Sequence, residues 1–193
     1  MTHQRLLEAS REVFLRRGFL AATVEEISSE AGYTRGALYK HFDGKEGLWH
    51  ALINIQVESY LTQLQDALTQ AGNRDELISA LDPGGTVSDP QAARWAIASA
   101  EYLAAVTTTQ PKHAAALATL QRRLDEQIVE IVSRHCGRLH IRPAIPLSQL
   151  VMALGALGGG LTLRWAIDPA IDMAGITKTF LTTVFPDAEG RGT

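Results

Sequence analysis

The chain has 193 residues, of which 46% are hydrophobic, and its formal net charge is −3. This length and hydrophobic content suit one or two globular domains, and the slightly acidic balance argues against a general binder of polyanions. Its single cysteine, Cys136, excludes an intrachain disulfide and fits a reducing compartment, and the charged, amphipathic N-terminus does not have the pattern of a signal peptide. We therefore expect a cytoplasmic protein.

The first predicted element is an amphipathic helix over residues 2–17, with Gly18 as its stop. The segment 23–42, TVEEISSEAGYTRGALYKHF, then has the pattern of a helix-turn-helix. Thr23 caps the first of these two helices, and Glu26 is placed to close a capping box with it. Gly32 ends that helix, and Thr34 caps a second helix over residues 35–41.

The second helix of this pair has two different faces. Leu38 and Phe42 point inward, whereas the opposite face carries Arg35, Gly36, Tyr39 and Lys40. No acidic residue lies between Glu30 and Asp43, although the first fifty residues are neutral overall, with seven Lys or Arg and seven Asp or Glu. A helix in the major groove of DNA needs cationic and hydroxyl donors, and a small residue where the backbone comes close. The pattern favours site-specific DNA binding, and a helix pair that contacts another protein is the alternative.

The remaining predicted elements are also helical, so the predicted fold class is all-α. We expect a long helix from Asp43 to about Gly72, a short one from Asn73 to Leu81, a loop at 82–90, and helices over 91–107, 111–134, 146–167 and 171–185. The uncharged segment 147–163 has about the minimum length of a membrane span, but it contains polar residues and runs into Arg164, which favours a buried or interface helix. The expected domains are a DNA-binding domain at 1–46, a helical effector-binding and dimerisation domain at 47–186, and a disordered tail at 187–193.

Residues 6–52 resemble the N-terminal domain of the TetR family of bacterial transcriptional regulators. The resemblance rests on Phe14, Gly18-Phe19, Ala22-Thr23-Val24, Ile27, Ala31-Gly32, Gly36-Ala37-Leu38-Tyr39, His41-Phe42 and Lys45-Glu46-Gly47-Leu48. It covers about a quarter of the chain, and Tyr33 departs from it where many members have a smaller aliphatic residue. The resemblance implies a homodimeric, ligand-responsive regulator of a double-stranded, palindromic DNA operator, most often a repressor. A small-molecule sensor or interaction module without DNA binding, or an activator of the same fold, is the alternative.

The DNA-contacting residues that we expect lie in and around the helix-turn-helix. Arg35 suits a guanine edge, Gly36 allows close approach of the backbone, and Ala37 reaches a thymine methyl group or a sugar. The backbone N–H of Thr23 suits a phosphate at a helix N-terminus. The remaining side chains are assigned to phosphates, and they are Thr34, Tyr39, Lys40, His41 and Lys45.

Two functions compete for the C-terminal half. Apolar residues on more than one side of the last two helices predict a four-helix dimer interface, with a monomer interior as the alternative; its residues are Leu150, Ala153, Leu154, Leu157, Gly160, Leu161, Ile176, Phe180 and Val184. Aromatic and flexible apolar residues predict a pocket for a small-molecule effector, with core packing as the alternative; its candidates are Trp95, Tyr102, His113, Leu117, Met152 and Trp165. We expect no cofactor and no enzymatic activity. No metal site is expected either, because the spacing of His135, Cys136 and His140 matches no closed zinc site.

Overall fold

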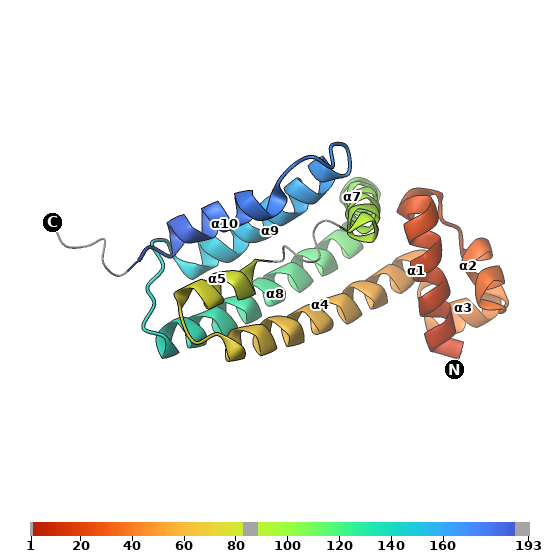
Figure 1. Ribbon diagram of the computed structural model, residues 1–193. Coiled ribbons are helices and arrows are strands. Elements are labelled where there is room, and N and C mark those ends of the chain that lie inside the picture. The colour runs from red at the N-terminus through yellow and green to blue at the C-terminus, as the bar shows by residue number, and fades with distance from the viewer. Residues whose placement is uncertain (1, 83–88, 188–193) are drawn as a thin grey trace. The chain divides into compact units, whose positions relative to one another are not determined.

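The computed structural model describes residues 2–82 and 89–187 (Figure 1). All regular secondary structure in these residues is α-helical, which confirms the predicted fold class. The helices are α1 (Thr2–Ala21), α2 (Val24–Ala31), α3 (Arg35–His41), α4 (Gly44–Gln70), α5 (Arg74–Leu81), α7 (Pro90–Thr109), α8 (Pro111–Arg138), α9 (Leu147–Trp165) and α10 (Met173–Val184). The predicted loop at 82–90 and the predicted tail at 187–193 lie mostly outside the described residues.

The chain divides into two compact units. The first unit comprises residues 1–59 and 94–118, and the second comprises residues 60–93 and 119–193. Each of the helices α4, α7 and α8 contributes residues to both units. The predicted boundary between residues 46 and 47 separates a DNA-binding domain from an effector-binding domain. It is defined by function and not by packing, so it stays a prediction.

An aromatic cluster forms the centre of the first unit. The ring of Trp49 on α4 stacks on Trp95 of α7 with centroids 4.5 Å apart, and it meets Phe14 of α1 edge-on at 5.1 Å. Phe19 meets Tyr102 of α7 edge-on at 4.9 Å. Burial of each large apolar side chain contributes about 1.5–3 kcal/mol. These contacts hold α1, the start of α4 and α7 together, and α2 and α3 pack onto the same core through Ile27 and Leu38.

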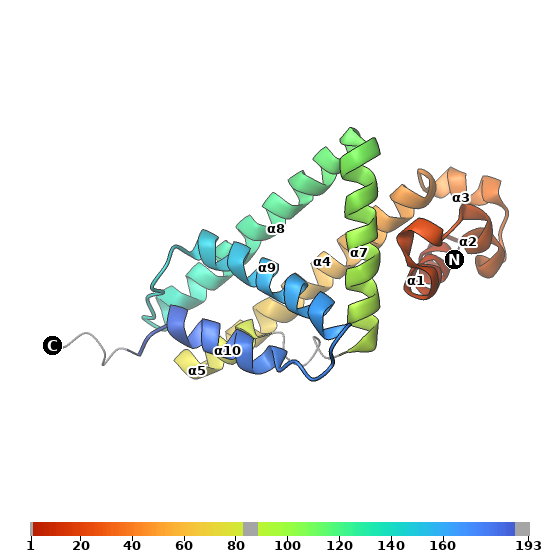
Figure 2. The same ribbon diagram turned by 90° about the horizontal axis from the view of Figure 1, so that it is seen from above.

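The second unit has its own core, formed by the C-terminal halves of α4 and α8 together with α5, α9 and α10. The helices α9 and α10 lie side by side in both views (Figures 1 and 2). The guanidinium of Arg74 on α5 donates to the backbone oxygens of Thr182 and Phe185 at the end of α10. A cation at a helix C-terminus satisfies carbonyls that have no partner within the helix, so Arg74 fixes α5 against α10.

The apolar helix α9 was the segment of the chain that most resembled a membrane span. Across the described residues, no helix is both long enough and apolar enough to cross a bilayer. Three residues of α9, namely Leu150, Val151 and Leu161, are instead buried within the protein.

Candidate nucleic-acid interface and ligand cavity

The helix-turn-helix is built by local caps at the residues that the sequence indicates. The side-chain oxygen of Thr23 accepts a hydrogen bond from the backbone N–H of Glu26 at 3.1 Å, which begins α2. Gly32 ends α2 with a φ of 74°, a left-handed conformation that glycine adopts without steric cost. The hydroxyl of Thr34 then accepts from the N–H of Ala37 at 3.2 Å and begins α3.

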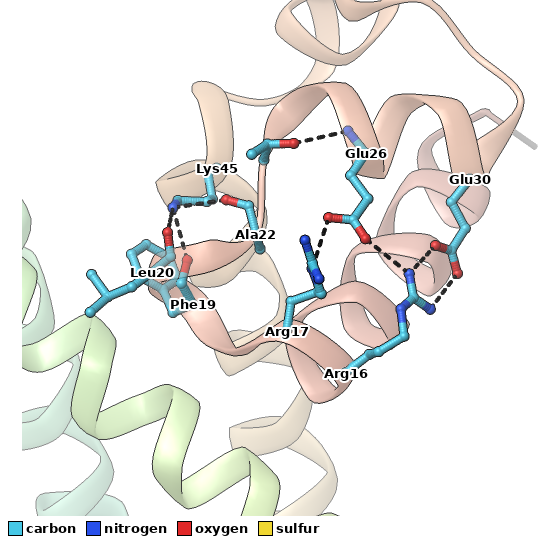
Figure 3. A network of polar contacts seen from close by, with 9 residues as sticks. Arg16, Arg17, Phe19, Leu20, Ala22, Glu26, Glu30 and Lys45 are labelled. Carbon is cyan, nitrogen blue, oxygen red and sulfur yellow. Dashed lines mark hydrogen bonds and ion pairs between the residues drawn. The ribbon is translucent and has the colours of Figure 1, made fainter.

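A network of ion pairs fixes α2 against α1 (Figure 3). The Arg16 guanidinium donates to the carboxylates of Glu30 and Glu26, and Arg17 pairs with Glu26 at 3.5 Å. These hydrogen bonds raise the pKa of Arg16 above its usual range, and they lower the pKa of Glu30. The carboxylate of Glu26 therefore pairs with arginines of α1, whereas the sequence pattern predicted that it would close a capping box with Thr23.

The outer face of α3, formed by Arg35, Gly36, Tyr39 and Lys40, is exposed, and Leu38 on the opposite side is fully buried. The Tyr39 side chain is 53% exposed. His41 at the end of the helix is also exposed, so four of the predicted DNA-contacting residues with donor side chains lie exposed on one short helix, namely Arg35, Tyr39, Lys40 and His41. Sequence reasoning missed one neighbour of this face, because Glu25 belongs to α2. Its carboxylate pairs with the Arg35 guanidinium at 2.7 Å.

Gly36 has no packing role within the protein. A Cβ atom placed there would meet only the Thr34 hydroxyl, at 3.8 Å. That distance is an ordinary van der Waals contact, so the protein's own core would accept alanine at this position. The Thr34 oxygen is occupied as an acceptor but keeps its O–H as a donor for another group. Ala37 is half-buried, and its N–H is already bound by this cap.

Lys45, which is predicted to contact a DNA phosphate, binds the protein's own backbone in the free chain, and the phosphate contact stays a prediction. Its ammonium donates to the backbone oxygens of Phe19, Ala22 and Leu20 at 2.8, 3.0 and 3.4 Å (Figure 3). It also lies 4.5 Å from the centroid of the Phe19 ring, a cation–π arrangement. Burial lowers the pKa of Lys45. Because an ammonium has three N–H donors, these three carbonyls use them all, and Lys45 fixes the end of α1 and the residue that follows it.

Glu101 on α7 contacts the same segment. We call residues 18–22 the connector; they begin at Gly18, where α1 is kinked by a non-helical backbone conformation, and end with Ala22. Its carboxylate accepts the backbone N–H of Leu20 at 3.0 Å. It also lies against Gly18, whose φ is 77°, and a Cβ atom at Gly18 would come within 2.5 Å of this carboxylate. Sequence analysis missed Glu101 because it lies about eighty positions from the backbone that it contacts.

The second unit contains a cavity of about 230 Å³. It is lined by residues of five helices, namely Tyr60, Leu81, Gln121, Leu124, Asp125, Ile128, Val132, Leu150, Val151, Leu154, Gly155, Gly158 and Thr177. The α8 residues recur at positions 121, 124, 125, 128 and 132, which is helical spacing, and polar residues interrupt that apolar face at 121 and 125. This pattern was the sequence signal that could have located the cavity.

None of the six residues that were predicted to form the pocket lines this cavity. Trp95, Tyr102 and Leu117 pack in the core of the first unit, which is the alternative that the sequence left open. The His113 ring lies 5.2 Å from the ring of His50 in that unit. Met152 is 68% exposed on α9, and Trp165 lies at the end of α9. Side-chain type was a poor guide because aromatic residues serve equally as core and as pocket lining.

His50 and Tyr102 form a polar pair inside the first unit. The His50 Nε2 and the Tyr102 hydroxyl are hydrogen-bonded to each other. Burial raises the pKa of Tyr102 to about 12, and burial together with the nearby His113 lowers the pKa of His50. Within the part of the chain that the structure describes, no group of three or more His, Cys, Asp or Glu residues is placed to hold a metal ion.

The predicted dimer-interface residues lie in three environments, namely the chain's own core, the cavity wall and positions that are exposed or half-buried. Leu150, Leu161 and Val184 are buried within the protein, so they belong to the chain's own core and not to a surface that a second subunit could cover. Leu154 lines the cavity. Ile176 is exposed, Gly160 is exposed, and Ala153, Leu157 and Phe180 are half-buried. Among the exposed apolar residues of α9, α10 and the segment between them are Met152, Leu163, Ile167 and Ile176.

Comparison with known proteins identifies relatives for both parts of the chain. Residues 6–52 match the family described as bacterial regulatory proteins of the tetR family. The HTH-type transcriptional activator FasR of Mycolicibacterium smegmatis is 30% identical over 135 residues, which span 68% of this chain and 59% of FasR. The HTH-type transcriptional repressor AcnR of Corynebacterium efficiens is 27% identical over 165 residues, or 86% of this chain and 82% of AcnR.

A solved structure has the same fold over nearly the whole chain. It is a Rhodococcus sp. protein assigned to the TetR-family transcriptional regulators, with a TM-score of 0.76 and 21% sequence identity. The match covers 96% of this chain and all of the Rhodococcus chain. At this level of identity the likeness establishes the fold of both units and leaves their ligands open.

Proposed function

Because the chain belongs to the TetR family of bacterial regulatory proteins, we propose that it is a ligand-responsive, DNA-binding transcriptional regulator. In this proposal it acts as a homodimer that represses transcription from a palindromic operator. The observation that carries the proposal is the exposed outer face of α3, which presents guanidinium, ammonium and hydroxyl donors around a glycine.

In this proposal α3 enters the major groove. Thr34, Tyr39, Lys40 and His41 bind phosphates, as does the N–H of Thr23 at the start of α2. Arg35 reads a guanine after it leaves Glu25. An exposed ion pair contributes only about 0–1 kcal/mol, whereas a bidentate contact to guanine discriminates by about 1–3 kcal/mol, so the exchange favours the operator. In the free protein, Glu25 holds the guanidinium beside the groove-facing side of α3.

The homodimer in this proposal forms through α9 and α10. The exposed apolar side chains of Met152, Leu163, Ile167 and Ile176 give a second subunit a surface to cover, and Ile167 is 87% exposed in the single chain. The proposed interface also includes four residues that were predicted to belong to it, namely Ala153, Leu157, Gly160 and Phe180. A two-fold axis then requires operator half-sites about one helical turn apart, or a multiple of that distance.

The effector in this proposal binds in the cavity of the second unit. Tyr60 brings α4 to the cavity wall, and α4 also begins directly after the helix-turn-helix. A ligand changes the affinity for DNA only if it binds the DNA-competent and DNA-incompetent states with different affinity. Release of the repressor therefore requires a ligand that fits the cavity better in the DNA-incompetent state.

The direct test measures binding to the DNA upstream of the chain's own gene, by nuclease footprinting and by fluorescence anisotropy over a salt titration. We expect a protected palindrome and an affinity that falls steeply with salt. The Arg35→Ala variant is expected to lose about 1–3 kcal/mol at the operator and to relax specificity at one base pair, whereas Lys40→Ala weakens binding to all sequences alike. Arg123→Ala, at an exposed arginine of α8, serves as the matched control.

Two outcomes would contradict parts of this proposal. Absence of any complex at low salt would favour the alternative of a sensor or interaction module that does not bind DNA. Equal losses on operator and random DNA for Arg35→Ala would remove its base-reading role. A reporter gene behind the same promoter decides the direction of control, because an activator would raise expression where a repressor lowers it.

A further inference from the structure

The charge of the cavity wall defines a class of ligand. Among the described residues that line the cavity, Asp125 is the only charged one. Most of the others are apolar, and the polar ones, Tyr60, Gln121 and Thr177, carry no formal charge. An isolated carboxylate beside apolar walls is costly unless a partner compensates for its lost hydration.

The carboxylate of Asp125 is only half satisfied by the protein. Its Oδ1 accepts from the Gln121 Nε2 at 3.0 Å, one helical turn earlier on α8. No described residue donates to its Oδ2, and no described lysine, arginine or histidine forms an ion pair with it. The neighbouring Arg122 is directed to Thr119 instead. The wall therefore keeps one negative acceptor available to whatever enters.

The rest of the wall offers space and the hydroxyls of Tyr60 and Thr177. Gly155 and Gly158 face the cavity from α9, and a Cβ atom at either would meet no other group within 4 Å. Thr177 is 6% exposed, and its hydroxyl has no hydrogen-bond partner in the described part of the chain. At about 230 Å³ the cavity is smaller than the clefts of about 300–1,000 Å³ that hold drug-sized ligands. A compact apolar body fits this space.

We propose that the cavity binds a small amphiphilic organic cation, with an ammonium group paired to Asp125 and an apolar body against Leu124, Ile128 and Leu154. This assignment rests on the proposed function, since it names the class of the effector. When a ligand displaces water from the cavity, a cation gives the carboxylate a partner, whereas a neutral ligand gives it none and an anion is repelled. Hydrogen bonds to a charged group are about twice as strong as neutral ones, so the head group dominates selectivity.

The test compares three probes that share one apolar chain, namely n-octylammonium, n-octanol and octanoate. Their binding to the full-length protein is measured by isothermal titration calorimetry at pH 7, where the amine is protonated. We expect n-octylammonium to bind at least about tenfold more tightly than n-octanol, and octanoate to bind most weakly. Equal affinity for the three probes, or no binding of n-octylammonium, would overturn the proposal.

Two variants of α8 test whether the preference for the cationic probe comes from the charge of Asp125 itself or from the net charge of the protein. Asp125→Asn keeps the shape and the acceptor for Gln121 but removes the charge, so the preference for n-octylammonium over n-octanol should disappear. Glu126→Gln removes a negative charge from the adjacent, exposed position, which does not line the cavity, and it should leave the preference intact. Equal effects of the two variants would assign the preference to general electrostatics and overturn the role of Asp125.

A third variant locates the binding. Gly158→Leu fills the cavity and should abolish binding of n-octylammonium and n-octanol alike, whereas Gly137→Leu, on α8 and away from the cavity, should not. Unchanged binding in Gly158→Leu would place the probe elsewhere. The test of the cation site can be separated from the test of the proposed function. If binding of n-octylammonium depends on Asp125 but leaves the affinity for DNA unchanged, the cation site is supported and control of DNA binding by this ligand is refuted.

Discussion

At the scale of single residues, Gly36 is a position where stability and function diverge. Nothing in the protein's own packing requires glycine there, since the nearest group to an added Cβ atom is 3.8 Å away. Glycine in a helix is about 1 kcal/mol less favourable than alanine. Under the proposed function, the close approach of the helix backbone to DNA accounts for glycine at this position of α3.

The Gly36→Ala variant should be more stable and bind DNA less tightly. Up to about 1 kcal/mol of helix propensity corresponds to a rise in Tm of about 2–4 °C for a chain of this size. The added methyl group should lower operator affinity because it meets a base or a sugar. Differential scanning fluorimetry and anisotropy titration measure the two effects, and Gly137→Ala controls for stability alone. Unchanged operator affinity in Gly36→Ala would show that the helix does not approach DNA at this position.

At the scale of elements, the connector of residues 18–22 is held by side chains of two other helices. Lys45 of α4 binds its carbonyls, and Glu101 of α7 binds the N–H of Leu20. The positive ammonium thus binds carbonyl oxygens of this short segment, and the negative carboxylate binds one of its N–H groups. Because α2 and α3 follow this segment directly, this pair supports the start of the helix-turn-helix.

Replacing Lys45 by methionine distinguishes a structural role from a phosphate contact. The apolar chain can still cover Phe19, but three carbonyls lose their donor, so we expect a loss of about 1–3 kcal/mol in unfolding free energy. The salt dependence of DNA binding should keep its slope. A phosphate ligand would give the reverse, with the slope reduced by about one and stability unchanged. Glu101→Gln, which keeps an acceptor for Leu20, should cost less than Lys45→Met.

At the scale of the whole molecule, each unit contains a histidine with a lowered pKa. His50 of the first unit is desolvated and lies near His113, with Glu46 opposing the shift. His135 of the second unit is desolvated and lies near Arg138 and Arg134. Both therefore prefer the neutral form in the folded protein, although they lie in separate cores.

The folded state should lose stability as the pH falls below about 6.5, the ordinary pKa of histidine. In that range these two histidines are protonated to a greater extent in the unfolded chain than in the folded protein. The unfolding free energy therefore decreases, by at most about 1.4 kcal/mol per pH unit for each histidine. Denaturant unfolding between pH 8 and pH 5 measures it. His50→Gln and His135→Gln should each flatten the curve. A curve that stays flat in the wild type would contradict both assignments.

The sequence by itself determined the helices and the faces of the helix-turn-helix. Caps such as Thr23, Thr34 and Asn73 act on N–H groups three positions away, and helical periodicity repeats within four, so both are readable from neighbouring residues. The exposure of Tyr39 and the burial of Leu38 follow from the same spacing.

Only the tertiary structure decided which distant groups meet. It brought Glu25 to Arg35, Glu101 to Leu20, and the cavity residues of five helices together, and none of these contacts lies within one helical turn. For a helix such as α9, which has apolar residues on several sides, the side that faces the chain's own core cannot be predicted from the sequence. Leu150 and Leu161 were thus assigned to an interface but lie inside, because the packing of α5, α8 and α10 selects the buried side.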